Sequence, residues 1–195
     1  MMFRRLSLAA PLAAIALAGC GVNAIPTAEE NAKAKWADVQ NQYQRRADLI
    51  PNLVATVKGY ATHEQQTLEG VTEARAKATS ITVSADDLKD PAKVKAFQDA
   101  QNQLSGALGR LLAVQESYPQ LQADQNFLAL QSQLEGTENR IAVARSDYNA
   151  AVQAYNTRIR TFPDTITAKI IYGAKPITPF TATAPNAEAA PKVSF

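Results

Sequence analysis

The sequence predicts an all-α protein, an antiparallel up-and-down bundle of four long helices followed by an irregular C-terminal tail. From Thr27 to Phe162 the chain is rich in Ala, Gln, Leu, Arg and Glu and poor in strand-favouring residues. Apolar residues recur there at intervals of seven, which is typical of an apolar seam on packed helices. Five of the ten prolines lie in the last 33 residues. We therefore place the bundle at residues 28–162 and an extended, Pro-rich tail at residues 163–195.

The N-terminus resembles a bacterial lipoprotein signal peptide. Arg4 and Arg5 precede about 13 small apolar residues, fewer than the ~20 that a helix needs to cross a bilayer. The segment ends in Leu17-Ala18-Gly19-Cys20, which resembles the lipobox, where the Cys thiol receives a diacylglycerol and the chain is cut before the Cys. We expect residues 1–19 to be cleaved by lipoprotein-processing enzymes and Cys20 to join the protein to membrane lipid. An ordinary signal peptide with a coincidental Cys and a short membrane helix are the alternatives.

Cleavage would also change the charge of the chain. It removes Arg4 and Arg5 and leaves 18 basic against 18 acidic side chains, so the precursor's charge of +2 belongs to targeting and does not argue for a nucleic-acid partner. The single Cys, once acylated, leaves no thiol for a disulfide or for nucleophilic catalysis. Residues 20–27 form the lipidated linker, which spans at most about 25 Å and holds the bundle close to the bilayer.

The first helical region keeps one seven-residue register through Trp36, Tyr43, Ile50 and Val57. A continuous helix kinked at Pro51 is one interpretation. Asp48 is a good N-cap, and Pro51 falls in the first turn after it. A single helix from residue 27 to residue 79 would also be much longer than the helices that it packs against. We therefore favour a break between Asp48 and Pro51, which gives helices at residues 27–48 and 50–79.

Two further helices are expected, at residues 91–118 and 121–162. Pro91 suits the first turn of one, and Pro119 ends it. Residues 80–90 form a connection with capping residues. Short connections make neighbouring helices antiparallel. The apolar seam of the last helix consists of Phe127, Leu134, Ile141, Tyr148, Tyr155 and Phe162.

The tail that follows cannot be helical throughout, because prolines interrupt it. Its apolar residues Ile166, Ile170, Ile171 and Tyr172 are expected to lie along the bundle. We expect residues 181–190 to be mobile.

Several polar residues depart from a plain bundle pattern. Glu138 and Arg145 border the last seam, Tyr148-Asn149 is repeated seven residues later as Tyr155-Asn156, and Arg46 keeps the register of the first helix. These residues form either a binding groove between helices or a hydrogen-bonded network that fixes helix register, because buried charges persist only when they are paired. The aromatic residues of the seams, among them Tyr118, are interpreted as core.

The sequence offers no recognisable catalytic constellation. A zinc helix of the kind that His63-Glu64 suggests needs a second His at position 67, which is Thr, and the chain has one His. Neither a nucleophile elbow nor a phosphate-binding loop is recognisable in the pattern. We therefore expect no catalytic residue, no metal site and no cofactor.

Several runs resemble the signature of the bacterial LemA family. They are Arg45-Arg46-Ala47-Asp48-Leu49-Ile50-Pro51-Asn52-Leu53-Val54, Lys58-Gly59-Tyr60-Ala61-Thr62-His63-Glu64, Leu134-Glu135-Gly136-Thr137-Glu138-Asn139-Arg140-Ile141, Ala144-Arg145, Tyr148-Asn149, Tyr155-Asn156, Phe162-Pro163 and Pro191-Lys192-Val193-Ser194-Phe195. The resemblance implies a membrane-attached bundle of long antiparallel helices outside the cytosol, in a family of poorly defined function. It supplies no catalytic residues. Many members keep an uncleaved transmembrane helix where this chain has a lipobox, and Gly21 after Cys20 would permit export to an outer membrane.

These features lead to three hypotheses for function, of which the third, hydrolase activity, would need an acidic cleft and a base that the sequence does not show. The first is a non-enzymatic envelope lipoprotein that faces the periplasm or exterior and acts as a scaffold for an unknown envelope protein. The second is a binder of a small ligand or cell-wall fragment that uses the Arg and Tyr-Asn positions between the helices. A pocket at these positions favours the second, and a closed, fully paired core favours the first.

The lipid anchor itself is directly testable. We expect Cys20→Ala to release the protein from membranes or to leave it as an unprocessed precursor, because the acyl chains replace a spanning helix. Membrane fractionation measures the release, and mass spectrometry of the protein shows whether the signal peptide is cleaved and residue 20 is acylated. A mature chain with an unmodified Cys20 thiol would contradict the lipoprotein assignment.

Overall fold

A computed structural model describes residues 23–181 of the chain, and within this range it is helical without a strand. The predicted all-α class is therefore confirmed. The expected signal peptide, Cys20 and the end of the tail lie outside the described residues. The long helices are α2 (Ala24–Tyr60), α3 (Gln65–Ser80), α4 (Pro91–Ala113) and α6 (Gln125–Arg158). The short ones are η1 (Asp86–Lys89), η2 (Val114–Ser117), α5 (Pro119–Gln122) and α7 (Asp164–Ile170).

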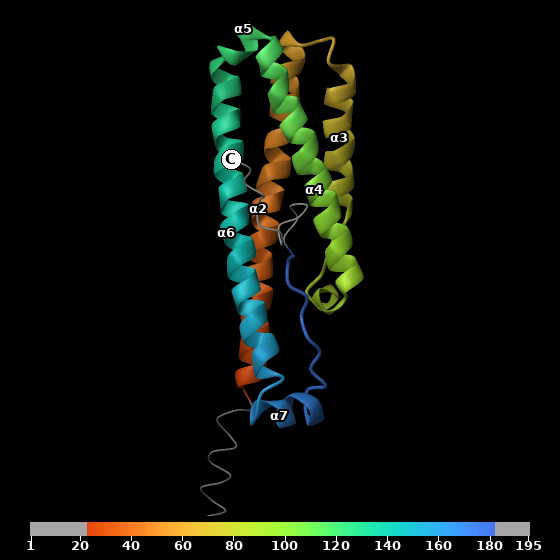
Figure 1. Ribbon diagram of the computed structural model, residues 1–195, viewed down its shortest axis with the longest axis vertical. Coiled ribbons are helices and arrows are strands. Elements are labelled where there is room, and N and C mark those ends of the chain that lie inside the picture. Colours follow the sequence, from red (N-terminus) through yellow and green to blue (C-terminus); the bar gives the residue numbers. More distant parts are fainter. Residues whose placement is uncertain (1–22, 182–195) are drawn as a thin grey trace, which may run out of the picture.

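The helices form a bundle with two halves of different construction. Helices α2 and α6 lie side by side along the whole length, and the shorter pair α3 and α4 covers them only at the end that carries α5 (Figure 1). Toward the other end, the extended segment after α7 runs beside the long pair (Figure 1). None of the helices in residues 23–181 is both long and apolar enough to cross a membrane.

Helix α2 begins at Ala24, inside the linker expected at residues 20–27, and it continues through Pro51, so the break that we favoured between Asp48 and Pro51 is wrong. Proline has no N–H, which leaves the carbonyl of Ala47, four residues earlier, without its helical donor. The Nε–H of Arg75 in α3 donates to this carbonyl at 2.8 Å. A neighbouring helix thus replaces the missing bond, and the chain turns at residues 61–64 instead.

The later helix boundaries agree with the sequence in outline. Asp90 caps α4 by accepting from the backbone N–H of Ala92 at 2.9 Å, and Pro91 is the first helical residue. The last helix is shorter than expected, because Asp124 caps a new start by accepting from the N–H of Phe127 at 2.8 Å. It ends at Arg158, before Phe162.

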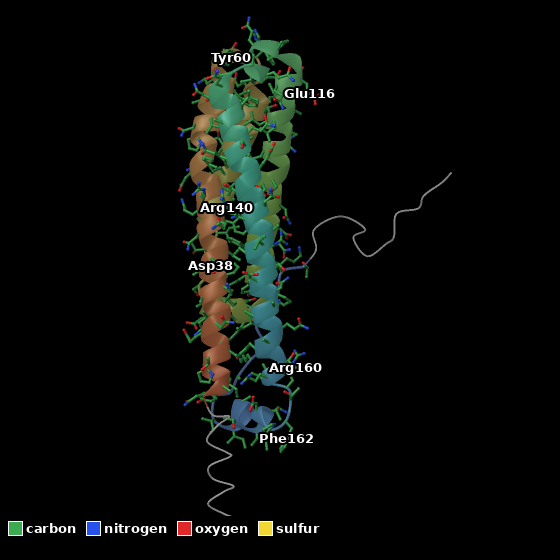
Figure 2. The ribbon with its side chains drawn as sticks, turned by 90° about the vertical axis from the view of Figure 1, so that its left-hand side faces the viewer. Asp38, Tyr60, Glu116, Arg140, Arg160 and Phe162 are labelled. Atoms are coloured by element: carbon green, nitrogen blue, oxygen red, sulfur yellow. The ribbon has the colours of Figure 1, made fainter. Side chains whose placement is uncertain are left out.

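The C-terminal region differs from the expected extended tail. Residues 164–170 form α7, and Gly173, with φ of 53°, then turns the chain into the extended segment. Phe162, expected in the apolar seam, is 80% exposed, and the residues expected to lie along the bundle are exposed as well: Ile166 by 52%, Ile170 by 79%, Ile171 by 61% and Tyr172 by 40%. Ile177 and Phe180 are buried in their place. Figure 2 shows Phe162 at the end of the bundle opposite Tyr60.

The core consists of two apolar clusters that follow one another along the bundle. One surrounds Trp36, which donates its indole N–H to the carbonyl of Val83 at 3.0 Å and packs against Phe97, Tyr148 and Phe180. The other lies between α2, α3, α4 and α6 and includes Leu53, Leu104, Leu111 and Leu134. Polar side chains occupy the level between the clusters.

The substitute bond at Pro51 predicts a non-additive pair of substitutions. Arg75→Ala should lower the free energy of unfolding by about 1–2 kcal/mol, because the carbonyl of buried Ala47 loses its donor. In a Pro51→Ala background, residue 51 regains its N–H, so the same substitution should cost less. Urea denaturation of the four variants measures the difference.

Lys95→Ala is the matched control, since it breaks an exposed ion pair on α4 and should cost about 0.5 kcal/mol or less. An equal cost of Arg75→Ala with and without Pro51 would rule out the proposed replacement of the helical bond.

Candidate functional site

The polar positions singled out in the sequence divide into two groups. Arg46 of α2 and Glu138 of α6 meet at the level between the apolar clusters. Arg145, Tyr148, Asn149, Tyr155 and Asn156 lie along α6 and bind the extended C-terminal segment. Arg145, seven residues after Glu138, also interacts with Tyr43 beside Arg46, so it borders the Arg46 network as well as the tail.

Arg46 is enclosed by hydrogen-bond acceptors from two other helices. Its side chain is 1% exposed. One terminal nitrogen donates to Glu138 Oε1 at 2.8 Å and to Ser105 Oγ at 2.7 Å. The other donates to Gln101 Oε1 at 2.6 Å and to the Gln101 carbonyl at 3.2 Å. One guanidinium thus joins α2, α4 and α6.

Two further contacts extend this network. Gln101 donates its amide N–H to the carbonyl of Ala78 at 3.2 Å and so reaches α3. The guanidinium carbon lies 5.0 Å from the ring centre of Tyr43, a distance suited to a cation–π interaction. Within residues 23–181, the Arg46 Nε has no hydrogen-bond partner. The remaining donors are satisfied only when all these helices keep their register.

The two asparagines of the Tyr-Asn repeat bind the tail in the same way. Asn156 accepts from the N–H of Ile177 at 2.9 Å and donates to the carbonyl of Ile177 at 2.8 Å. Asn149 accepts from the N–H of Phe180 at 2.8 Å and donates to its carbonyl at 3.0 Å. Each side-chain amide pairs with both backbone groups of one residue, as a neighbouring strand would.

The two tyrosines add a second row of bonds. Tyr155 donates its hydroxyl to the carbonyl of Lys175 at 3.1 Å, and Tyr148 donates to that of Thr178 at 2.8 Å. Burial raises the pKa of Tyr155 to about 12 and raises the pKa of Tyr148 as well. Both phenols therefore remain protonated donors at any physiological pH.

The spacing of the two partners explains why the contacts repeat. Seven residues of α-helix rise about 10.5 Å, and three residues of polyproline-like chain rise about 9.3 Å. The tail repeats every three residues, as Pro176-Ile177-Thr178 and Pro179-Phe180-Thr181. Its prolines sit between the paired residues, where no N–H is needed, while Ile177 and Phe180 point into the core at 2% and 5% exposure.

The tail is also held from α4 and η1. Thr181 offers its carbonyl to Gln98 of α4 at 2.6 Å and to Arg145 at 3.1 Å. The Arg145 guanidinium lies over the Phe180 ring at 4.8 Å. The N–H of Thr178 donates to the carbonyl of Leu88 at 2.9 Å.

Sequence reasoning missed four polar residues. Ser105, Gln101 and Gln98 take part in these networks, and Arg75 donates to the Ala47 carbonyl that Pro51 leaves without a donor. Sequence reasoning also missed that the tail is the binding partner of the Tyr-Asn repeat. The three-residue repeat of the tail, matched to the seven-residue Tyr-Asn repeat, is the sequence signal that would have revealed the pairing.

The arrangement leaves little room for a ligand at the predicted positions. Asn149 and Asn156 border a shallow surface hollow of about 280 Å³ with Gln153 and Arg160. The same asparagines use their amides on the tail. His63 is exposed in the turn before α3, and its neighbour Glu64 accepts from the Tyr118 hydroxyl at 3.3 Å. In the described part of the chain, no three His, Cys, Asp or Glu side chains gather as a metal site would require.

These features define a helical bundle whose open half is closed by its own C-terminal segment. The model of the LemA family matches residues 35–195, a range that includes the Arg46 network, the Tyr-Asn repeat and the tail. The chain therefore belongs to the LemA family, as the sequence resemblance predicted.

Curated relatives agree with this assignment. Magnetosome protein MamQ 2 of Paramagnetospirillum magneticum is 30% identical over 157 residues, which cover 72% of this chain and 58% of the relative. Magnetosome protein MamQ of Magnetospirillum gryphiswaldense is 29% identical over the same shares. Protein LemA of Metamycoplasma hominis is 27% identical over 64% of this chain and 52% of its own length. The chain thus spans little more than half the length of these relatives.

The paired bonds predict that single asparagine substitutions loosen the tail. Asn156→Ala removes two backbone bonds to Ile177, and Asn149→Ala removes two to Phe180. Each should lower the free energy of unfolding by about 1–3 kcal/mol. Amide hydrogen exchange at Ile177 and Phe180 should accelerate, because their N–H groups lose their acceptors.

Asn139→Ala is the matched control, as an exposed asparagine on the same helix. It should leave both amides protected. Continued protection of the Ile177 amide in Asn156→Ala would contradict the proposed pairing.

Proposed function

We propose that this protein is a lipid-anchored lipoprotein of the cell envelope that acts as a non-catalytic scaffold or partner-binding bundle. The main support is that the polar side chains between the helices form their hydrogen bonds with other groups of the same chain. Arg46 is enclosed by Glu138, Ser105 and Gln101, and the Tyr-Asn repeat holds residues 175–180. Side chains used in this way stabilise a shape rather than bind a substrate.

The scaffold is an antiparallel up-and-down bundle of four helices stiffened by the tail. Helix α6 has 34 residues and is therefore about 51 Å long. The level at Arg46 ties the long helices together, and the bonds to residues 175–181 tie the tail to α6 and α4. Because such a bundle is stiff, each partner-binding surface on the outside of its helices lies at a fixed distance from the lipid anchor.

The anchor is the acylated Cys20, three residues before the start of the described chain at Asn23. That distance is at most about 11 Å, so the beginning of α2 lies near the membrane surface. The protein faces the periplasm or exterior, and Gly21 is compatible with transfer to an outer membrane. Two or three acyl chains make the attachment firm, whereas a single chain binds only marginally.

The ligand-binding alternative has less support. It requires Arg46, Glu138, Arg145 and Tyr148 to line one open pocket. Arg46 and Glu138 bind each other, while Arg145 and Tyr148 donate to the tail carbonyls of Thr181 and Thr178. A ligand at the Tyr-Asn positions would have to displace the tail and its paired backbone bonds.

Recovery of a partner tests the scaffold proposal. The full-length lipidated protein, cross-linked in its native membrane and then solubilised, should bring down an envelope protein in a fixed ratio. Cys20→Ala is the control and should lose this partner, because it is no longer held at the membrane. Repeated recovery of the wild-type protein alone, or turnover of a hydrolase substrate by the purified protein, would speak against a non-catalytic scaffold.

A further inference from the structure

One end of the bundle carries a cluster of exposed apolar side chains, which we call the apolar tip. It consists of Phe162, Ile166, Ile170, Ile171 and Tyr172, each at least 40% exposed. Single exposed apolar residues are ordinary on protein surfaces, but a contiguous group marks an interaction surface. These five lie within eleven consecutive residues, in and around α7.

Helix α7 is oriented so that it exposes its large side chains. Its buried residue is the small Ala168, at 1% exposure. Ile166 and Ile170, two residues before and after it, are 52% and 79% exposed. The helix therefore packs on the bundle through a methyl group and leaves its isoleucines outside, the reverse of the usual arrangement for a surface helix.

The apolar tip lies at the end where α2 begins. Figure 1 places α7 beside the first turn of α2, at the end opposite α5. In Figure 2, Arg160 and Phe162 are at this end, and Tyr60 and Glu116 are at the other. The start of α2 at Ala24, four residues after Cys20 in the sequence, therefore lies next to the tip.

The charges around the tip favour an anionic surface. Arg160, Lys169 and Lys175 are exposed near it. At this end of α6, Arg158 forms an ion pair with Asp164 at 3.7 Å. Among the described residues, Arg160, Lys169 and Lys175 form no ion pair. Lys and Arg beside an apolar surface, together with an aromatic such as Tyr172, are the combination found where proteins enter the headgroup layer of a bilayer.

We propose that the apolar tip inserts into the interfacial layer of the same membrane that holds the acylated Cys20, so that the bundle stands on this end. The inference rests on the lipid anchor of the proposed function. Anchor and tip are then two membrane contacts of one chain, and together they set the orientation of the rod as well as its location. The occupant of the apolar surface is the lipid bilayer.

Site-specific labelling of the full-length lipidated protein tests this orientation. Cys20 is the only cysteine in the sequence. Once it is acylated, Ile166→Cys or Ile170→Cys supplies the sole free thiol for an environment-sensitive fluorophore. The labelled protein is reconstituted in vesicles that contain anionic lipid, with and without brominated acyl chains. Leu128→Cys is the control, since Leu128 is an apolar residue of 47% exposure near the opposite end of α6.

The fluorophore at residue 166 or 170 should be quenched by brominated lipid and shielded from aqueous iodide, while the one at residue 128 behaves oppositely. Iodide access at 166 and 170 in protein that still floats with the vesicles would overturn the inserted tip and leave the anchor intact. Failure to float would overturn both. Shielding from iodide without quenching by brominated lipid would mean that protein, such as a second copy, covers the tip, and would also overturn the proposal.

Discussion

Arg46 carries a full charge at 1% exposure between two apolar clusters, and such a charge is stable only while its partners stay in place. Those partners are Glu138 on α6, and Ser105 and Gln101 on α4. Sliding any of these helices by one turn, about 5.4 Å, would leave the guanidinium unpaired. Apolar seams alone tolerate such shifts far better, because their contacts are not directional. The Arg46 level therefore selects one register for the whole bundle.

The C-terminal segment meets a second requirement, which is to cover the half of the long helix pair that α3 and α4 do not reach. At the border of that half, where Phe97 of α4 packs on Trp36, Phe180 completes the cover: its ring centre lies 5.7 Å from that of Trp36 and 5.5 Å from that of Tyr148. An extended chain has unpaired backbone groups, and the Tyr-Asn repeat supplies partners for them. Apolar burial and backbone pairing thus depend on the same short segment.

The candidate site was predictable in its residues but not in its partners. Arg46, Glu138 and the Tyr-Asn pairs stand out in the sequence because polar side chains occupy positions of an apolar seven-residue pattern. Nothing local indicates that Arg46 meets Glu138, whereas Arg145, in the same register, binds Thr181. Those choices depend on which helix or segment lies opposite each level of α6.

Local sequence patterns are enough to predict the all-α class, the seven-residue seams and the capping of α4 at Asp90, because helix periodicity and capping depend on neighbouring residues. Packing between helices keeps α2 continuous through Pro51, since the replacement donor, Arg75, comes from another helix. It also decided the fate of Phe162, which fits the seam in sequence yet is 80% exposed because the helix ends at Arg158. Periodicity states which residues share a face, but only packing states what covers that face.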